Sequence, residues 1–276
     1  MKNIGISSFA YRYSIGLPGL IPINPMSALD FLHSAHELGF QGVQLCENLN
    51  ISDMDDAEWA LIKNRADELG LFLEVGMNTV TVDSLTKHIE IADNLSASFL
   101  RIVLGGPRCY KAEDAYRARD EFIAIFQQVL PLAKKCRIAM GVENHFDLPT
   151  YALREIVDAV DDESLGLIVD TTNGIHFLER PEETLEICRG RIVSIHLKDY
   201  LPQKVEAGHF ISGTVLGTGD LDVPPFLCAC DNIIMEMTTR RPDGYTVGQV
   251  IEWERNAVAA SAKALFHYAN QLTAGG

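Results

Sequence analysis

The sequence from 137 to 173 contains RIAMGVEN (137–144), then a helix-sized segment, then LGLIVDTTN (165–173). Both runs are apolar at nearly every position rather than at alternate ones, as in strands of a parallel sheet whose two faces are both covered. Each run carries an acidic residue near its end, Glu143 in the first and Asp170 in the second. This order predicts a strand, a helix and a second parallel strand, with polar groups at the carboxyl ends of the strands.

Runs of the same kind continue in both directions along the chain. Eight strands are expected, with starts near residues 4, 43, 72, 99, 138, 166, 192 and 233, so that successive starts lie 26 to 41 residues apart. That spacing is the length of one βα unit. We therefore predict an α/β fold, a (β/α)8 TIM barrel that forms a single domain over residues 1–276, although an open doubly wound sheet would show the same alternation.

The segment SALDFLHSAHELGF (27–40) shows how the strands are connected. Ser27 fits an amino-terminal helix cap, and Gly39 fits a stop. Its apolar residues recur at helical spacing, so a buried face is expected to contain Leu29, Leu32 and Ala35.

Three connections are longer than the others. They follow the first, fourth and seventh strands and read YRYSIGLPGLIPINP (11–25), GGPRCYKAED (105–114) and YLPQKVEAGHFISGTVLGTGDLDVPP (200–225). Because the last is rich in Gly and Pro, we expect it to lack regular structure, and we expect all three to lie over the active face.

Composition and charge narrow the choice of partners and compartment. The formal net charge is −15, which disfavours nucleic acid and anionic membrane surfaces as partners. No stretch approaches the roughly 20 apolar residues that span a bilayer. The six cysteines, at 46, 109, 136, 188, 228 and 230, include no CxxC pair. We interpret them as reduced thiols of a cytoplasmic protein.

Four successive strands end in a residue that can bind a metal ion. They are Glu143, Asp170, His196 and Glu236, with spacings of 27, 26 and 40 residues. In a closed barrel these side chains would meet at one mouth, where three carboxylates repel one another unless a cation lies between them. The set predicts one divalent ion, Mn2+ or Mg2+ in the first place, with Co2+ or Zn2+ as alternatives.

Such a site suits proton transfer next to a carbonyl group. An ion bound to adjacent carbonyl and hydroxyl oxygens of a substrate would acidify the proton alpha to the carbonyl, and Glu143 and Glu236 could remove and return that proton. Taken singly, an acidic residue at a strand end is more often a helix cap or an ion-pair partner, and His196 could be a buried structural histidine. The shared position of all four on neighbouring strands favours the metal site.

Five stretches carry a resemblance to a known family: GVENH (141–145), LIVDTTN (167–173), IHLKD (195–199), GTGDLDVPPF (217–226) and IIMEM (233–237). Together they resemble the xylose isomerase-like barrel superfamily of sugar isomerases and epimerases, which includes ketose 3-epimerases, inosose dehydratases and endonuclease IV. The resemblance implies that the four strand-end residues are metal ligands, that Glu143 and Glu236 are the acid/base pair, and that the protein is a homodimer or homotetramer.

The sequence departs from the relatives at several positions. Epimerases place a histidine where Asn173 stands and often an arginine where Pro202 stands. Lys198, Lys204 or His209 could supply a cation instead, although Lys198 could equally lie on the outer surface, and for Lys204 the outer surface is the favoured place. The extra histidines of the DNA repair branch are also absent, because the second to fourth strands end in Glu47 and Asn48, Met77 and Asn78, and Gly105 and Gly106.

Further polar residues are expected near the mouth. Glu47 would either bind a substrate hydroxyl or pair with Arg12, and Asn144 and His145 would either line the pocket or cap the next helix. The predicted substrate-binding residues are Glu47, Asn144, His145, Asn173 and Lys198.

The sequence thus leads to three functional hypotheses. The first is a metal-dependent isomerase or epimerase of a ketose or related small polyhydroxylated, sugar-like substrate, which works by proton transfer through a metal-stabilised enediolate. The second is a metal-dependent lyase on the same scaffold, such as an inosose or dehydroshikimate dehydratase. The third, a non-catalytic sugar-binding relative, requires a decayed site, whereas all four ligands are present.

Overall fold

The computed structural model describes residues 2–105 and 112–274, without the side chains of 112–118, 273 and 274. Eight parallel strands close into a barrel in which β1 pairs with both β2 and β10. The strands are β1 (Asn3–Ser7), β2 (Gly42–Leu45), β3 (Phe72–Asn78), β4 (Phe99–Val103), β5 (Ala139–Glu143), β6 (Leu165–Asp170), β7 (Ile192–Leu197) and β10 (Asn232–Met235). The predicted barrel is confirmed, and every strand starts within one residue of its expected position.

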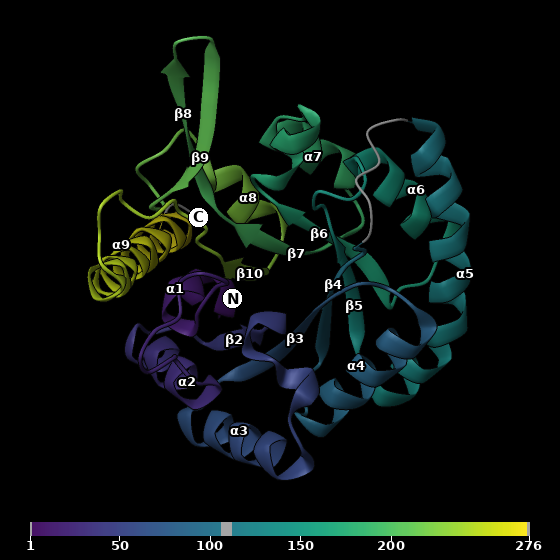
Figure 1. The fold of residues 1–276 in the computed structure, drawn as a ribbon. Helices are drawn as coiled ribbons and strands as arrows, with labels where there is room; N and C mark the ends of the chain where they lie inside the picture. The colour runs from purple at the N-terminus through teal and green to yellow at the C-terminus, as the bar shows by residue number, and fades with distance from the viewer. Residues whose placement is uncertain (1, 106–111, 275–276) are drawn as a thin grey trace.

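Helices surround the barrel and cover its outer face (Figure 1). They are α1 (Arg12–Ile15), α2 (Ala28–Glu37), α3 (Asp56–Leu69), α4 (Val82–Asn94), α5 (Ala112–Cys136), α6 (Thr150–Val160), α7 (Pro181–Cys188), α8 (Val223–Ala229) and α9 (Val247–Ala274). Short 3-10 helices lie at η1 (Ser8–Tyr11), η2 (Glu47–Leu49), η3 (Ile51–Asp53) and η4 (Asn173–Phe177).

Helix α2 shows how well the local pattern defines a helix. Ser27 caps it in a reciprocal capping box with Asp30, and Gly39 follows it with a φ of 85°, as expected. The predicted buried face is wrong at Leu29, which is 37% exposed. The buried positions are Ala28, Phe31, Leu32 and Ala35. These follow the i, i+3, i+4, i+7 spacing, and Leu29 lies one residue, or about 100°, away from Ala28.

The connection after β7 forms a hairpin rather than an unstructured loop. Strands β8 (Asp199–Val205) and β9 (Gly208–Thr214) pair in antiparallel register and project from the barrel (Figure 1). Gly208 has a φ of 137°, a conformation that glycine adopts without strain, and it allows the tight reversal. The prediction of irregular structure was therefore wrong here. In the connection after β4, the predicted loop falls largely on 106–111, outside the described residues.

Asp199 fixes the base of this hairpin. Its buried carboxylate accepts hydrogen bonds from the backbone N–H groups of Tyr200, Gly217, Gly219 and Leu221. A Cβ atom on Gly219 would lie 2.3 Å from Asp199 Oδ1. The IHLKD and GTGDLDVPPF stretches are thus adjacent in the fold. In both stretches, the residues that make these hydrogen bonds have a structural role.

Within the described residues, no helix combines the length and apolar character needed to cross a bilayer. The five described cysteines, at 46, 136, 188, 228 and 230, are free thiols.

Candidate metal centre and active site

The four candidate ligands meet at the carboxyl end of the barrel. Glu143 and Asp170 end β5 and β6, His196 lies in β7, and Glu236 directly follows β10. All four are buried, and one potential ligand atom from each lies within 4.8 Å of the others. Strand register explains the convergence, because His196 is the pairing partner of both Asp170 in β6 and Ile234 in β10. The predicted cluster is confirmed as a group that could hold a metal ion.

Three buried atoms of this cluster have no hydrogen bond within the described chain: Asp170 Oδ2, His196 Nδ1 and Glu236 Oε2. Charged neighbours are close, since Lys198 Nζ lies 2.8 Å from Asp170 Oδ2 and 3.1 Å from Glu236 Oε2. His196 Nδ1 lies 3.3 Å from an oxygen of Glu143 and 3.3 Å from an oxygen of Glu236. We take these contacts as ion pairs without hydrogen-bond alignment. Buried polar atoms without partners are rare in folded proteins. A divalent cation would satisfy all three, so the residues fit a metal site.

The remaining ligand atoms are held in place by neighbours. Asp170 Oδ1 accepts hydrogen bonds from the backbone of Thr172 and Asn173, and Asn173 Nδ2 donates to Glu143 Oε1 at 3.0 Å. Asn144 accepts from the N–H of Asp170 and donates to its carbonyl oxygen. Both asparagines therefore orient ligands.

The charges in the cluster stabilise one another. Burial alone would lower the pKa of His196, but the carboxylates of Glu143 and Glu236 outweigh it and raise that pKa to about 9. Burial would raise the pKa of Glu143, but the nearby Arg101 guanidinium holds it well below its usual range. Lys198 likewise outweighs burial and lowers the pKa of Glu236 to about 2. Both glutamates are thus kept as carboxylates, the form that a cation and a proton acceptor both require.

Arg101 is a site residue that the sequence analysis missed. It is 2% exposed in β4, and its Nε donates to Glu143 Oε2 while its Nη1 lies 3.4 Å from Glu47 Oε2. Glu47 also accepts a hydrogen bond from Asn78 Nδ2, and the expected pairing of Glu47 with Arg12 is wrong. The signal was present in the sequence, because an arginine in the middle of the apolar run FLRIV needs a buried carboxylate partner.

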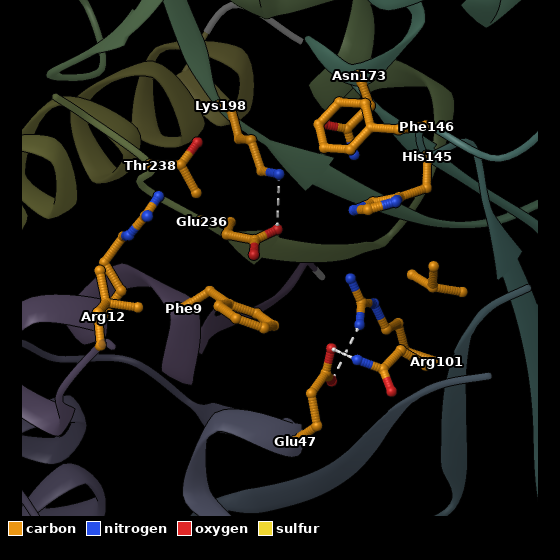
Figure 2. Close-up of a pocket in the computed structure, with 13 residues that line it drawn as sticks. Phe9, Arg12, Glu47, Arg101, His145, Phe146, Asn173, Lys198, Glu236 and Thr238 are labelled. Carbon is orange, nitrogen blue, oxygen red and sulfur yellow. Dashed lines mark hydrogen bonds and ion pairs between the residues drawn. The ribbon is translucent and has the colours of Figure 1, made fainter. Parts of the chain in front are cut away.

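A pocket of about 360 Å³ opens beside the cluster (Figure 2). Four of the predicted substrate-binding residues line it, namely Glu47, His145, Asn173 and Lys198, whereas Asn144 lies outside the lining. Asn144 is fully occupied by the β6 backbone, so we correct its expected place from the pocket wall to the support beneath it.

Of the three residues that could supply a cation to the substrate, one is buried and two are exposed. Lys198 is buried and points at Glu236, so it is no outer-surface residue (Figure 2). Lys204 lies exposed on β8 beside Pro202, and His209 lies exposed on β9. Neither Lys204 nor His209 lines this pocket. The remaining wall combines the aromatic rings of Phe9 and Phe146 with polar groups.

Comparison with known proteins places this chain in a family. Residues 32–257 match the family described as xylose isomerase-like TIM barrel, and the chain belongs to that family. A 3-oxo-isoapionate decarboxylase from Pectobacterium atrosepticum is 29% identical over 262 residues, which cover 92% of this chain and 88% of the relative.

Solved structures agree on the fold. A D-psicose 3-epimerase with D-tagatose, from Clostridium cellulolyticum H10, superposes with a TM-score of 0.71 at 15% identity over 98% of this chain and 99% of that one. A xylose isomerase-like TIM barrel protein from Mycobacterium smegmatis in complex with magnesium gives a TM-score of 0.66 at 13% identity over 96% and 98%. These identities support the fold alone. The family match and the decarboxylase relative point to an enzyme on this scaffold, and that relative leaves its exact class open.

Proposed function

We propose that this chain is a divalent-metal-dependent isomerase or epimerase that moves a proton next to the carbonyl group of a small sugar-like substrate. The observation that carries the proposal is the cluster of four buried candidate ligands beside a polar pocket, in which one atom each of Asp170, His196 and Glu236 has charge contacts but no hydrogen bond among the described residues. The pocket volume suits a small molecule, and its mixture of carboxylate, amide and ammonium groups suits a polyhydroxylated one.

Four residues would hold the ion: Glu143, Asp170, His196 and Glu236. When bound, a divalent ion would draw electron density from a carbonyl oxygen and favour the enediolate that forms as the neighbouring proton leaves. Manganese or magnesium suits three carboxylates and one imidazole best.

The protein's own groups would transfer the proton. Glu143 ends β5 and Glu236 follows β10, and β6 and β7 separate these strands in the barrel, so the two side chains reach the cluster from different strands. Glu236 also lines the pocket. One can accept the proton and the other can return it. Arg101 and Lys198 keep both glutamates ionised, and Asn173 fixes the orientation of Glu143.

A lyase is the second candidate, and a specific observation favours it. The relative that matches 92% of this chain is a decarboxylase of a 3-oxo sugar acid, and the epimerase residues expected at Asn173 and Pro202 are replaced here. In a decarboxylation the bond between the alpha carbon and the carboxylate breaks, its electron pair passes into the enolate, carbon dioxide leaves, and an acid then protonates the carbon. The same cluster would serve this step and a dehydration.

Nuclear magnetic resonance in D2O separates these reactions. Metal-loaded protein would be incubated with ketoses, inososes and 3-oxo sugar acids, with a chelator-treated sample as the control. An isomerase or epimerase keeps the carbon skeleton and gains deuterium at the exchanged carbon, whereas a lyase loses carbon dioxide or water. Turnover that survives complete removal of metal would refute the metal-dependent function altogether.

A further inference from the structure

We propose that Arg12 binds a carboxylate group of the substrate, so that this enzyme acts on a sugar acid rather than on a neutral sugar. The inference rests on the proposed function and specifies its substrate class. It concerns a residue for which the sequence analysis considered only a pairing with Glu47.

Arg12 lines the pocket next to the candidate metal centre, together with Lys198, Glu236 and Thr238. Figure 2 shows Arg12 and Thr238 on one side of the pocket and Arg101 and His145 on the other. The Nε atom of Arg12 is buried, and within the described chain its guanidinium makes neither a hydrogen bond nor an ion pair. Its guanidinium carbon lies 5.3 Å from the ring of Tyr13, and its charge acts on the buried carboxylate of Glu254 without a direct ion pair. A buried donor on a permanent cation is costly unless something pairs with it.

The other two cations of the pocket already have partners. Arg101 pairs with Glu143 and Glu47, and Lys198 lies between Asp170 and Glu236. Among the described residues that line this pocket, Arg12 is therefore the cation left for a ligand.

The chemistry of Arg12 points to a ligand that carries a carboxylate. Glu47 is engaged by Arg101. Glu254, whose charge Arg12 stabilises without a direct ion pair, already accepts hydrogen bonds from Tyr13 and Ser14. A substrate carboxylate would give Arg12 a direct partner. The planar fork of a guanidinium matches a carboxylate, whereas a phosphate dianion would need further donors that are already engaged here.

The backbone that carries Arg12 is firmly anchored. Glu254 of α9 is fully buried and accepts hydrogen bonds from Tyr13 N at 2.7 Å and from Ser14 N and Oγ at 2.7 and 2.6 Å. Tyr13 Oη donates to the carbonyl oxygen of Thr239, just beyond β10. Figure 1 shows α1 beside α9. Arg12 is thus presented to the pocket from a fixed segment, which lowers the entropic cost of binding through it.

The test compares two probes that differ only in the acidic group, D-erythronate and erythritol. Their binding to wild type, Arg12→Gln, Arg12→Lys and the surface control Arg189→Gln would be measured by calorimetry, with and without Mn2+. Arg189 is exposed and pairs with Glu186, away from the pocket lining. We expect wild type and Arg189→Gln to bind erythronate at least tenfold more tightly than erythritol. Arg12→Gln should lose this preference without weakening erythritol binding, and Arg12→Lys should keep part of it.

Three results would overturn the assignment: no preference in wild type, a full preference in Arg12→Gln, or an Arg12-dependent preference for erythritol 4-phosphate over erythronate. Circular dichroism of each variant shows whether it is folded. If Arg12→Gln does not fold, Arg12→Lys still tests whether the preference depends on the guanidinium, because lysine keeps the charge but not the planar fork. If the protein binds no metal, the proposed function fails, while the metal-free comparison of the two probes still tests Arg12. If metal binds but the preference does not depend on Arg12, this inference alone fails.

Discussion

The barrel interior contains two buried polar clusters that differ in one respect. In the first, Glu74 of β3 is 3% exposed, and both its oxygens accept hydrogen bonds, from Gln44 Nε2 at 2.9 Å and Asn232 Nδ2 at 2.7 Å. The second is the candidate metal centre, where buried atoms of Asp170 and two other residues lack hydrogen bonds. Burial of an acid therefore does not by itself mark a functional site. Buried atoms that have charge contacts but no hydrogen bond distinguish the candidate functional cluster from the structural one.

Among the described residues, a hydrogen bond from Gln44 to His196 connects the two clusters. Gln44 Nε2 lies 3.1 Å from His196 Nε2, so the satisfied cluster supports the ring that presents Nδ1 to the metal centre. Such supporting contacts orient ligands around metal ions. If this comparison is correct, substitutions in the two clusters should affect different measurements.

The largest effect is expected for Glu236→Gln. The amide keeps the shape of the side chain but can neither accept a proton nor offer a charged ligand, so kcat should fall by about a thousandfold, or ~4 kcal/mol. The rate would be measured on the substrate that the resonance experiment identifies. Glu252→Gln, on the exposed side of α9, is the matched control. A Glu236→Gln enzyme within tenfold of wild type would show that Glu236 is not an acid/base.

Glu74→Ala should act on stability instead. It removes the acceptor of two buried amide groups, and we expect the free energy of unfolding to fall by about 3 kcal/mol. Urea titration in chelator would measure this loss, and elemental analysis should still find one bound ion per chain. Loss of the ion without loss of stability would reverse the roles given to the two clusters.

Asp170→Asn should weaken metal binding by about tenfold to a hundredfold, which corresponds to roughly 1.4–2.8 kcal/mol. The amide has no charge for the ion, although it can still accept backbone hydrogen bonds. Calorimetric titration with Mn2+ would measure the affinity, with the surface variant Asp158→Asn as control. Equal affinities in the two variants would remove Asp170 from the ligand set.

The smallest effect concerns pH. Burial raises the pKa of Glu74, and the hydrogen bonds from Asn232 and Gln44 only partly offset this. The folded state therefore holds the proton more tightly than the unfolded state, whose glutamates titrate near roughly pH 4.3. The stabilisation is complete below that pH and is lost as pH rises through the higher folded pKa. The unfolding free energy of wild type minus that of Glu74→Gln should thus decrease with rising pH in this window. A flat difference would contradict the raised pKa.

The sequence predicted the features that depend on chain order and period. Continuous apolar runs located the strands, and their ends located Glu143 and Asp170, because barrel closure brings all strand ends to one mouth. Lys198, one of the predicted substrate-binding residues, follows from the same reasoning, since it lies two residues after His196 and alternation puts both side chains on the same face.

Other features depend on side-chain directions that the sequence does not determine. The partner of Arg101 follows from the register between β4 and β5, which sequence alone does not specify. The sequence did not exclude a pair between Arg12 and Glu47, whereas in the described residues Glu47 contacts Arg101. The hairpin was missed because its Gly and Pro content resembles that of an irregular loop.

The most direct test of the account is a crystal structure grown with Mn2+ and measured for anomalous scattering. We expect one anomalous peak per chain at the carboxyl end of the barrel, within roughly 2.0–2.4 Å of Glu143, Asp170, His196 Nδ1 and Glu236. A site without a peak, or a peak that fewer than three of these side chains contact, would contradict the central claim that the unsatisfied cluster is built to hold a metal ion.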